Sequence, residues 1–444
     1  MNFVPRSGFA WVGRVLVGST LLLVAGSLLL HAPTVGKEPT NAAQEEDTEP
    51  FRPEAGKFPP LEQALSYRGE LIFVDHANRR GSIRVQGSGM FFRNDPHPFA
   101  MLPYGMVRYH NAPADLRDVP LGTVMHAKAF LPPDPRISAV PVLPIDNRTR
   151  DGNHNRGAGI FPAENHVLLL EDEPSHCRRE GLVWKLQEID IRNNAGMIVA
   201  SLEAEDGSEV LIGDENMTFD AGTRIWVGRE LLGIDEWVAE GDLPSEGKHS
   251  LGGQSVLLGI IWKPTADGIF TRFHISDIWL DDAAMERAAH RQTETHKAFI
   301  RSRWMPAWID AVEYGEFGQA MVTATLFGGM DESLYADFTE GRPAMVNAVE
   351  NTLKHTHGAY GAAHMASRGT IREVLKSDGE VPLGSSGIQI RFETDLIIEG
   401  IRPGRVVRVR PDNWPQVQVP REEYLNDANS LEERFPSPSI FPRY

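Results

Sequence analysis

The chain has 444 residues, more than one hydrophobic core usually serves, so we expect two to four domains. Its 44 lysine and arginine residues against 61 aspartate and glutamate residues give a net charge of -17, which disfavours nucleic acid as a partner. The single cysteine, Cys177, has no partner in the chain for a disulfide. We therefore expect it to be a small packed residue, and the fold to depend on hydrophobic cores.

The N-terminal region contains an apolar, uncharged run at residues 15–30, with arginines before it and acidic residues after it. This pattern predicts a signal peptide or membrane anchor within residues 1–32, with the rest of the chain exported into the cell envelope. Pro33 disfavours cleavage at the nearest suitable site, so we expect a retained anchor, with secretion as the alternative. Residues 33–65 are rich in Pro, Glu and Ala and predict a flexible stalk.

Beyond the stalk, short alternating apolar runs are separated by Gly, Asn, Asp and Pro, a pattern typical of hairpins in small barrels. We expect a mainly β chain with a few helices, in which tandem small OB-like β-barrel modules are linked by one long helix. The expected order is module 1 (66–140), a connecting segment (141–182), module 2 (183–264), a linking helix (265–305), module 3 with a short helix (306–365), module 4 (366–415) and a C-terminal tail (416–444).

One hairpin sequence occurs twice. Residues 71–85 and 186–200 share a leucine, an aspartate, an asparagine, a glycine and an isoleucine in register. Asp and Gly are residues that turns need, because Asp bonds its own turn backbone and Gly accepts positive φ. We predict that both stretches form strand, turn and strand in copies of one β module, with Asp75 and Asp190 at the same turn position.

The likeness continues downstream of both hairpins, to Tyr109 in the first stretch and Trp226 in the second. A hairpin alone is too common to prove a repeat, so the strands that carry these two residues should pair equivalently in their sheets. A weaker echo at residues 311–324 predicts a third copy.

Residues 281–304 predict one long helix, with an aspartate cap at its start and Pro306 after its end. Its apolar stripe is thin, so we expect it to bridge modules rather than lie in a core. A shorter helix is predicted over 343–355, with its apolar residues on one face.

Three histidines, His355, His357 and His364, lie within ten residues and could offer zinc or copper three imidazoles. The spacing matches no strong zinc motif, and His355 lies where a histidine interacts well with the last carbonyls of a helix. A capping and loop role is therefore the favoured interpretation, and a metal site is the alternative. Apart from this metal hypothesis, the sequence indicates no cofactor.

Three consecutive carboxylates, Glu171, Asp172 and Glu173, follow an apolar strand, as the acid and base of a hydrolase might. Neighbouring residues of a strand point to opposite faces, so a solvated turn is the favoured interpretation. Convergence of these groups with His166 or His176 in a deep pocket would instead indicate an enzyme.

The most basic strand contains Arg402, Arg405, Arg408 and Arg410. It has no aromatic platform on which bases could stack, so we expect its arginines to pair with the acidic surface.

At residues 112–123, 168–175 and 323–338 the chain resembles uncharacterised exported multi-module proteins of planctomycete-type bacteria. The resemblance implies a bacterial, extracytoplasmic setting, and it brings no activity and no site residues. We expect a non-enzymatic, envelope-associated protein with a binding or scaffolding role towards an envelope protein or a small ligand. A His-rich metal-binding protein and a hydrolase with acidic residues near 171–173 are the alternatives.

Overall fold

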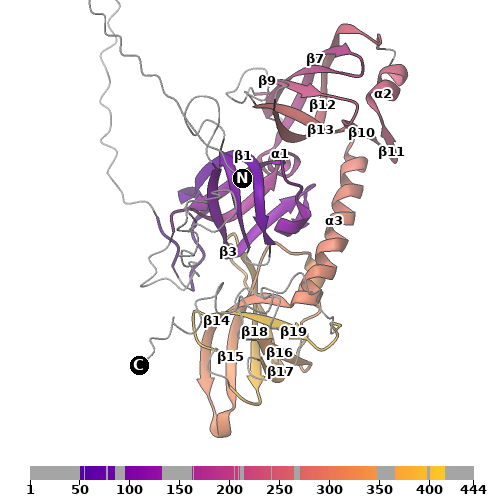
Figure 1. The fold of residues 1–444 in the computed structure, drawn as a ribbon. Helices are drawn as coiled ribbons and strands as arrows, with labels where there is room; N and C mark the ends of the chain where they lie inside the picture. The colour runs from indigo at the N-terminus through magenta and orange to yellow at the C-terminus, as the bar shows by residue number, and fades with distance from the viewer. Residues whose placement is uncertain are drawn as a thin grey trace, which may run out of the picture. The chain divides into compact units, whose positions relative to one another are not determined.

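The structure is a computed structural model (Figure 1). It describes residues 51–54, 56–76, 79–85, 96–132, 163, 165–204, 206–208, 210, 215–241, 243–264, 271–347, 366–397 and 401–415. The predicted export segment and C-terminal tail lie outside these residues. Within them, no helix combines the length and the apolar character that a membrane span requires.

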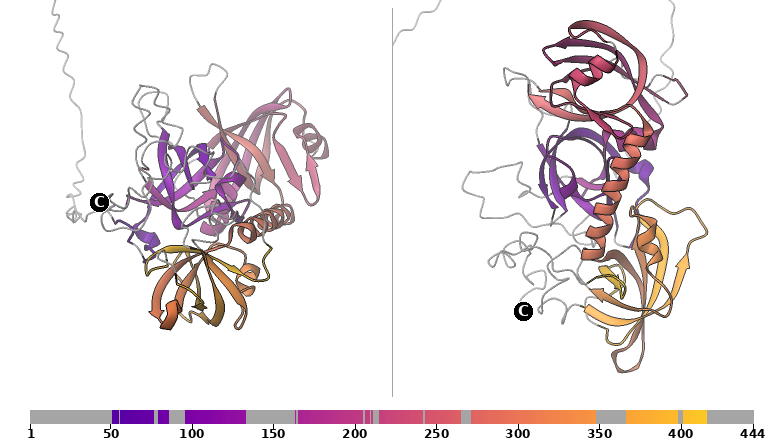
Figure 2. Two further views of the ribbon diagram at one scale, coloured as in Figure 1. Left: turned by 60° about the horizontal axis from the view of Figure 1, so that its bottom comes forward. Right: turned by 90° about the vertical axis from the view of Figure 1, so that its right-hand side faces the viewer.

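The first barrel contains the first predicted module. Its sheet runs in the order β2-β1-β5-β6-β3-β4, and β2 also pairs with β3, which closes the ring seen in the right-hand view of Figure 2. The β3–β6 pairing is parallel, as in OB-type barrels. The strands are β1 (Leu65–Asp75), β2 (Arg80–Val85), β3 (Pro96–Tyr109), β4 (Ala112–Ala114), β5 (Val124–Phe130) and β6 (Asn165–Asp172).

Strand β6 extends this barrel into the predicted connecting segment 141–182. Residues 166–170 form a histidine followed by an apolar run, and each is buried, so the segment is an interior strand rather than a linker. The first module therefore ends near Asp172.

The second barrel repeats the arrangement of the first. Its sheet runs in the order β11-β10-β13-β12-β7-β8-β9, and β9 also pairs with β13 in parallel. The helix α2 (Ile234–Glu240) lies between β11 and β12. The strands are β7 (Leu182–Arg192), β8 (Ala195–Ala204), β9 (Glu215–Phe219), β10 (Arg224–Val227), β11 (Glu230–Leu232), β12 (Gly247–Pro264) and β13 (Thr271–Trp279). Strand β13 lies within the segment predicted as part of the linking helix.

The parallel pairing has the same register in both barrels. In the first barrel Met101 pairs with Val167 and Val107 with Leu170, so β3 advances six residues while β6 advances three. In the second, Thr218 pairs with His274 and Arg224 with Asp277, which is the same advance of six against three. Tyr109 and Trp226 follow at the same distance, so the strands that carry them pair equivalently, as the repeat requires.

Two local features also coincide. The ladder of the first hairpin has a bulge directly after the buried Leu71, and that of the second has one directly after the buried Leu186. Each barrel has a capping box before its short helical segment: the backbone N–H of Asp115 bonds Asp118, and that of Gly233 bonds Glu236. These coincidences confirm that the first two barrels are copies of one module.

The predicted equivalence of the two turns is wrong. Asp75 pairs with Arg80 at the end of its strand, whereas Asp190 lies inside a longer hairpin. That hairpin continues until Asn193 and Asn194 turn with φ of 53° and 57°. Because asparagine tolerates this left-handed region, the second ladder extends two residues beyond Asp190.

The third barrel is closed in the order β14-β15-β18-β17-β16-β19, with antiparallel pairs. It takes strands from both stretches predicted as modules 3 and 4, which therefore form a single module. It lacks the parallel pairing among its described strands, so the echo at 311–324 marks a hairpin and not a third copy. The strands are β14 (Met305–Tyr314), β15 (Ala320–Phe327), β16 (Pro343–Asn347), β17 (Ala366–Lys376), β18 (Ser385–Thr394) and β19 (Val406–Pro411).

The predicted short helix over 343–355 is wrong where the structure describes it. Pro343–Asn347 form β16, which pairs with β17 on one side and β19 on the other. Ala344 and Val346 reach the barrel core from this strand, and Val346 is fully buried there. Pairing on both sides therefore overrides the local helical pattern.

The long helix prediction is confirmed by α3 (Asp282–Arg303), which runs from β13 to β14 (Figure 2). Asp281 caps it by accepting from the backbone N–H of Ala284 at 2.7 Å. Its apolar residues are more buried than expected: Met285 packs with Trp279, and Phe299 and Ile300 join the core of the third barrel. The remaining helices are α1 (Glu173–Glu180) and, among the described residues, α4 (Glu332–Ala336).

The first and third barrels meet in an aromatic cluster. The rings of Phe58, Tyr104 and Trp308 lie with centroids 4.9 to 5.2 Å apart, and Phe327 joins them. Phe58 belongs to the segment predicted as stalk, but its ring is a large apolar group that packs, half-buried, against the cluster. The stretch directly before β1 is therefore part of the folded structure.

Candidate functional site

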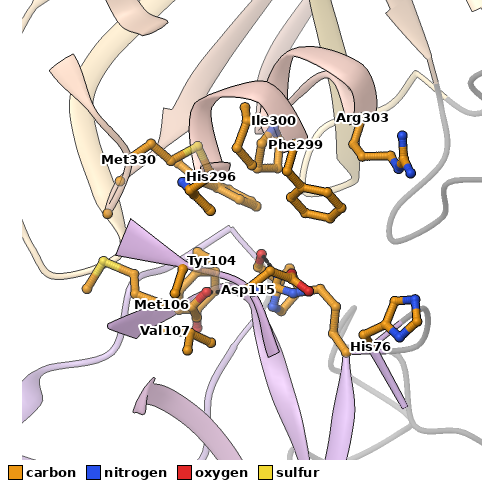
Figure 3. Close-up of a pocket in the computed structure, with 18 of the residues that line it drawn as sticks. His76, Tyr104, Met106, Val107, Asp115, His296, Phe299, Ile300, Arg303 and Met330 are labelled. Atoms are coloured by element: carbon orange, nitrogen blue, oxygen red, sulfur yellow. Dashed lines mark hydrogen bonds between the residues drawn. The ribbon is translucent and has the colours of Figure 1, made fainter. Parts of the chain in front are cut away.

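A small cavity lies between the first barrel, α3 and the third barrel (Figure 3). Strand β3 and the β1–β2 turn supply one wall, and His296, Phe299, Ile300 and Arg303 of α3 supply the opposite wall. Arg408 of β19 and the turn at Gly328–Met330 complete the lining. A volume of about 50 Å³ suits a ligand of a few heavy atoms.

Positive charge dominates this cavity. Arg79, Arg303 and Arg408 line it, while Asp115 is the one carboxylate among its described lining residues. The exposed fractions of Arg303 and Arg408 are 3% and 7%, so little solvent is available to screen their charges. Buried charges are ordinarily paired, which makes this excess of guanidinium groups the most informative feature of the site.

The Arg79 side chain is fixed by the backbone of the β3 strand. Its guanidinium donates to the carbonyl oxygens of Leu102 at 3.2 Å, Pro103 at 2.6 Å and Gly105 at 2.5 Å. These bonds satisfy its donors without neutralising its charge, because carbonyl oxygens carry only partial charges. Arg79 therefore contributes a rigid positive charge to the cavity wall.

Arg408 is held less completely. Its Nη1 donates to the carbonyl oxygen of Trp304 at 3.3 Å, while its buried Nε has no hydrogen-bond partner among the described residues. Burial, followed by the charges of Arg79 and Arg303, lowers the pKa of Arg408 to about 9. Asp115 acts in the opposite direction but does not offset these effects.

Asp115 is itself unfavourably placed for ionisation. Burial raises the pKa of this carboxyl group, although Arg79 and a hydrogen bond from the backbone N–H of Arg117 both favour the charged form. Its side chain also caps the 3-10 turn Leu116–Asp118 by accepting a hydrogen bond from the backbone N–H of Arg117. The carboxylate therefore leaves the guanidinium groups only partly compensated.

Neutral polar groups complete the lining. Burial lowers the pKa of His296 to about 4, so its imidazole is neutral near pH 7. Its Nδ1 and the hydroxyl of Tyr104 are buried and have no hydrogen-bond partner within the described parts of the chain. The site thus combines an excess of guanidinium groups over carboxylates with hydrogen-bonding atoms of His296 and Tyr104 that have no partner in the described residues, an arrangement that can bind a small anion.

The predicted metal histidines, His355, His357 and His364, lie outside the described residues. Within those residues, no group of three or more histidine, cysteine, aspartate or glutamate side chains is arranged to hold a metal ion.

The carboxylates predicted to lie in a solvated turn are instead buried, and this prediction is wrong. Glu171, Asp172 and Glu173 have exposed fractions of 1%, 2% and 1%. They lie where β6 passes into α1, whose cap is Asp172. A substrate cannot reach groups so deeply buried, so the geometry does not favour the hydrolase.

Glu173 is the centre of a buried network. It accepts from Arg68 at 3.0 Å and from the indole N–H of Trp184 at 3.1 Å, and its Oε2 lies 2.7 Å from Nε2 of His126. Burial alone would raise its pKa, but the charges of Arg68 and His126 hold it well below its usual range. The His176 ring stacks on His126, with centroids 3.7 Å apart.

This network joins the first barrel to the start of the second. Glu171 pairs with Arg179 at 2.7 Å, but its Oε2 lies 3.8 Å from Nδ1 of His176, beyond hydrogen-bond reach. His166 is fully buried elsewhere in β6. Cys177 is fully buried, as predicted, and burial raises the pKa of its thiol. These described groups do not converge in the way that the hydrolase hypothesis required. The contacts of Glu173 instead join β1, β5 and β7.

The basic strand is also placed differently from the prediction. Arg408 does not pair with the acidic surface but faces the cationic cavity, and Arg410 lies over the ring of Trp304 with its centroid 5.7 Å away. Burial lowers the pKa of Arg410, with Asp412 opposing this change.

Sequence reasoning missed most of the cavity. Arg79 follows a hairpin strand, Asp115 precedes a turn, and Arg303 lies in the last turn of the long helix. None belongs to a motif, because the residues come from elements far apart in the chain. The alternation of arginine and valine in β19 was the one available signal, since it predicts arginines on one face.

A comparison with models of known protein families found no match. Comparisons with curated proteins and with solved structures likewise found none.

Proposed function

We propose that the protein is an extracytoplasmic binding protein that holds a small anion, such as a phosphate, sulfate or carboxylate group, in the cationic cavity. The observation that carries this proposal is the lining of three guanidinium groups against one carboxylate among the described residues. A bound anion would add negative charge to a cavity whose described lining holds more guanidinium groups than carboxylates.

The geometry gives the anion distinct partners. Arg408 offers a buried Nε without a hydrogen-bond partner in the described residues, and guanidinium groups match the oxygens of carboxylates and phosphates. Tyr104 and His296 can add neutral hydrogen bonds. A volume of about 50 Å³ admits an anionic group but not a nucleotide, which agrees with the unfavourable net charge for nucleic-acid partners.

The location in the cell envelope is part of the same proposal and rests on the sequence. The apolar run at 15–30 supports export, with the anchor retained because of Pro33. The resemblance to exported planctomycete-type proteins points to the same setting. The tandem barrels would then present the anion site outside the membrane.

Calorimetric titration of the full chain with phosphate, sulfate and acetate, in a buffer free of other oxyanions, tests the binding site. At least one of these anions should bind with one site per chain, and Arg408→Met should weaken its binding at least tenfold. Arg372→Met is the matched control, because Arg372 is 52% exposed and pairs with Glu393 on the surface of the third barrel.

Two results would contradict the proposal. One is the absence of binding for all three anions by the wild-type chain. The other is equal binding by wild-type and Arg408→Met chains whose circular dichroism spectra agree.

A further inference from the structure

A groove of the third barrel shares one turn with the cationic cavity. Gly328, Gly329 and Met330 line both spaces. Figure 3 places Met330 on one wall of the cavity and Met106 on the other, at the same end. The groove has a volume of about 900 Å³, against about 50 Å³ for the cavity. A ligand whose anionic group lies in the cavity therefore has room beyond this turn for a larger remainder.

Two connections of the third barrel line the groove. The connection from β15 to β16 supplies the shared turn and residues of α4, and the hairpin from β17 to β18 supplies the rest. The backbone N–H of Gly328 donates to the carbonyl oxygen of Gly384 at 2.8 Å, which joins the two connections. The hydroxyl of Tyr335 donates to the carbonyl oxygen of Phe327 at 2.7 Å. Hydrogen bonds within the barrel therefore hold the groove in shape.

The lining of the groove mixes both signs of charge with hydroxyl and apolar groups. Glu332 and Lys376 are exposed there, and neither forms an ion pair within the described residues. The hydroxyls of Ser377 and Ser385 each accept from a backbone N–H two residues further along, and their own O–H groups donate to no partner in the described parts of the chain. The apolar side chains among these groups include Phe338, Val374 and Ile388.

This mixture favours one kind of remainder. A carboxylate only accepts hydrogen bonds and an ammonium group only donates them, whereas a ligand hydroxyl does both and can bond either. The C–H groups of a sugar can pack against the apolar side chains at the same time. An alkyl remainder would leave the polar groups unused, and a second charged group would meet a charge of its own sign at Glu332 or Lys376.

We propose that the ligand is a sugar that carries one anionic group, such as a sugar phosphate or a sugar acid. Its anionic group lies in the cationic cavity and its hydroxyl-bearing part lies in the groove. Met106 and Met330 at the end of the cavity have flexible side chains that can adjust to the link between the two parts. This inference rests on the proposed anion binding and adds the chemical class of the ligand.

Calorimetric titration of the full chain with matched ligands tests the inference. Phosphate, acetate and sulfate are each compared with a sugar derivative, which is glucose 6-phosphate, glucuronate or glucose 6-sulfate. They are also compared with an alkyl derivative, which is hexyl phosphate, hexanoate or hexyl sulfate. For at least one parent anion, the sugar derivative should bind at least tenfold more tightly than the parent, and more tightly than the alkyl derivative.

Replacing the two charged groove residues tests where the sugar lies. In the Glu332→Gln/Lys376→Met chain, the ratio of the parent's Kd to the sugar derivative's Kd should fall below about threefold. Both residues are exposed, so the exchange leaves the barrel core intact. Arg372→Met removes a charge from the same barrel outside the groove and should keep the ratio at tenfold or more.

The outcomes separate this inference from the proposed function. Binding of a parent anion without any gain from the sugar would overturn the inference and leave the anion site in place. Absence of binding by every parent and every derivative would overturn both. Tighter binding of the alkyl derivative would overturn the inference in favour of an amphiphilic anion, and an undiminished ratio in the double variant would overturn the placement of the sugar in the groove.

Discussion

The cationic cavity predicts that removing one of its charges stabilises the anion-free protein. The pKa of Arg408 is lower in the folded state than in the unfolded chain, so folding disfavours the charged guanidinium. Charged Arg408 therefore destabilises the folded state at every pH below about 9. Lowering the pKa from 12.5 to about 9 corresponds to about 5 kcal/mol, at about 1.4 kcal/mol for each pKa unit. This is an upper value, because local relaxation and residual hydration reduce it.

Arg408→Met removes this charge and keeps much of the side-chain volume. The variant loses the hydrogen bond to the carbonyl oxygen of Trp304, which contributes about 1 kcal/mol. We therefore expect a net stabilisation of the third barrel by about 2 kcal/mol in buffer free of oxyanions at pH 7. With the preferred anion at saturation, the wild-type chain should gain stability and the variant should gain little.

Amide hydrogen exchange of β14 and β19 measures this effect within the third barrel, since the whole chain need not unfold in one step. Arg372→Met, on the exposed surface of the same barrel, should change the exchange free energy by less than about 0.5 kcal/mol. If Arg408→Met instead destabilises the barrel by about 2 kcal/mol in oxyanion-free buffer, the chain itself compensates the charge of Arg408 and the reasoning is refuted.

Other contacts predict distinct outcomes. Glu173→Gln should lower the free energy of unfolding by about 3 to 5 kcal/mol at pH 7. Because the pKa of Glu173 is depressed in the folded state, the difference from wild type in urea titrations should shrink as the pH falls below about 4.5. A difference that stays constant with pH would contradict the network. Leu71→Ala and Leu186→Ala should each destabilise their own barrel by about 2 to 5 kcal/mol in hydrogen exchange, and a loss below about 1 kcal/mol in either would oppose their equivalence. Gly329→Ala should lower the melting temperature, because the added Cβ meets the Met106 side chain and φ at this position is 77°. Adding Met106→Ala should recover part of the lost melting temperature. No recovery would show that backbone strain alone is responsible.

Much of the architecture could be predicted because its signals are local. The period-2 alternation and the turn residues indicated β modules, and the aspartate cap and following proline indicated α3. The two hairpins revealed the repeat, although the Asn193–Asn194 turn shifted one return strand. The third barrel could not be divided correctly, since β16 belongs to it through pairing with β17 and β19, which its own sequence does not encode.

The candidate site depends on proximity between distant segments and so gave no sequence signal. Arg79 and Arg408 approach the same cavity from opposite ends of the folded chain. Conversely, the carboxylates at 171–173 formed a visible cluster but serve a buried junction. The clustering of charges along the sequence was therefore a poor guide to their clustering in space.

The common register of the first two barrels has an evolutionary consequence. A pairing pattern that is shared together with its irregularities is what the duplication of one ancestral unit within a gene would leave. At the capping box, Asp115 of one descendant corresponds to Gly233 of the other, which offers no carboxylate there. The two barrels thus differ at a residue that lines the candidate site in the first of them.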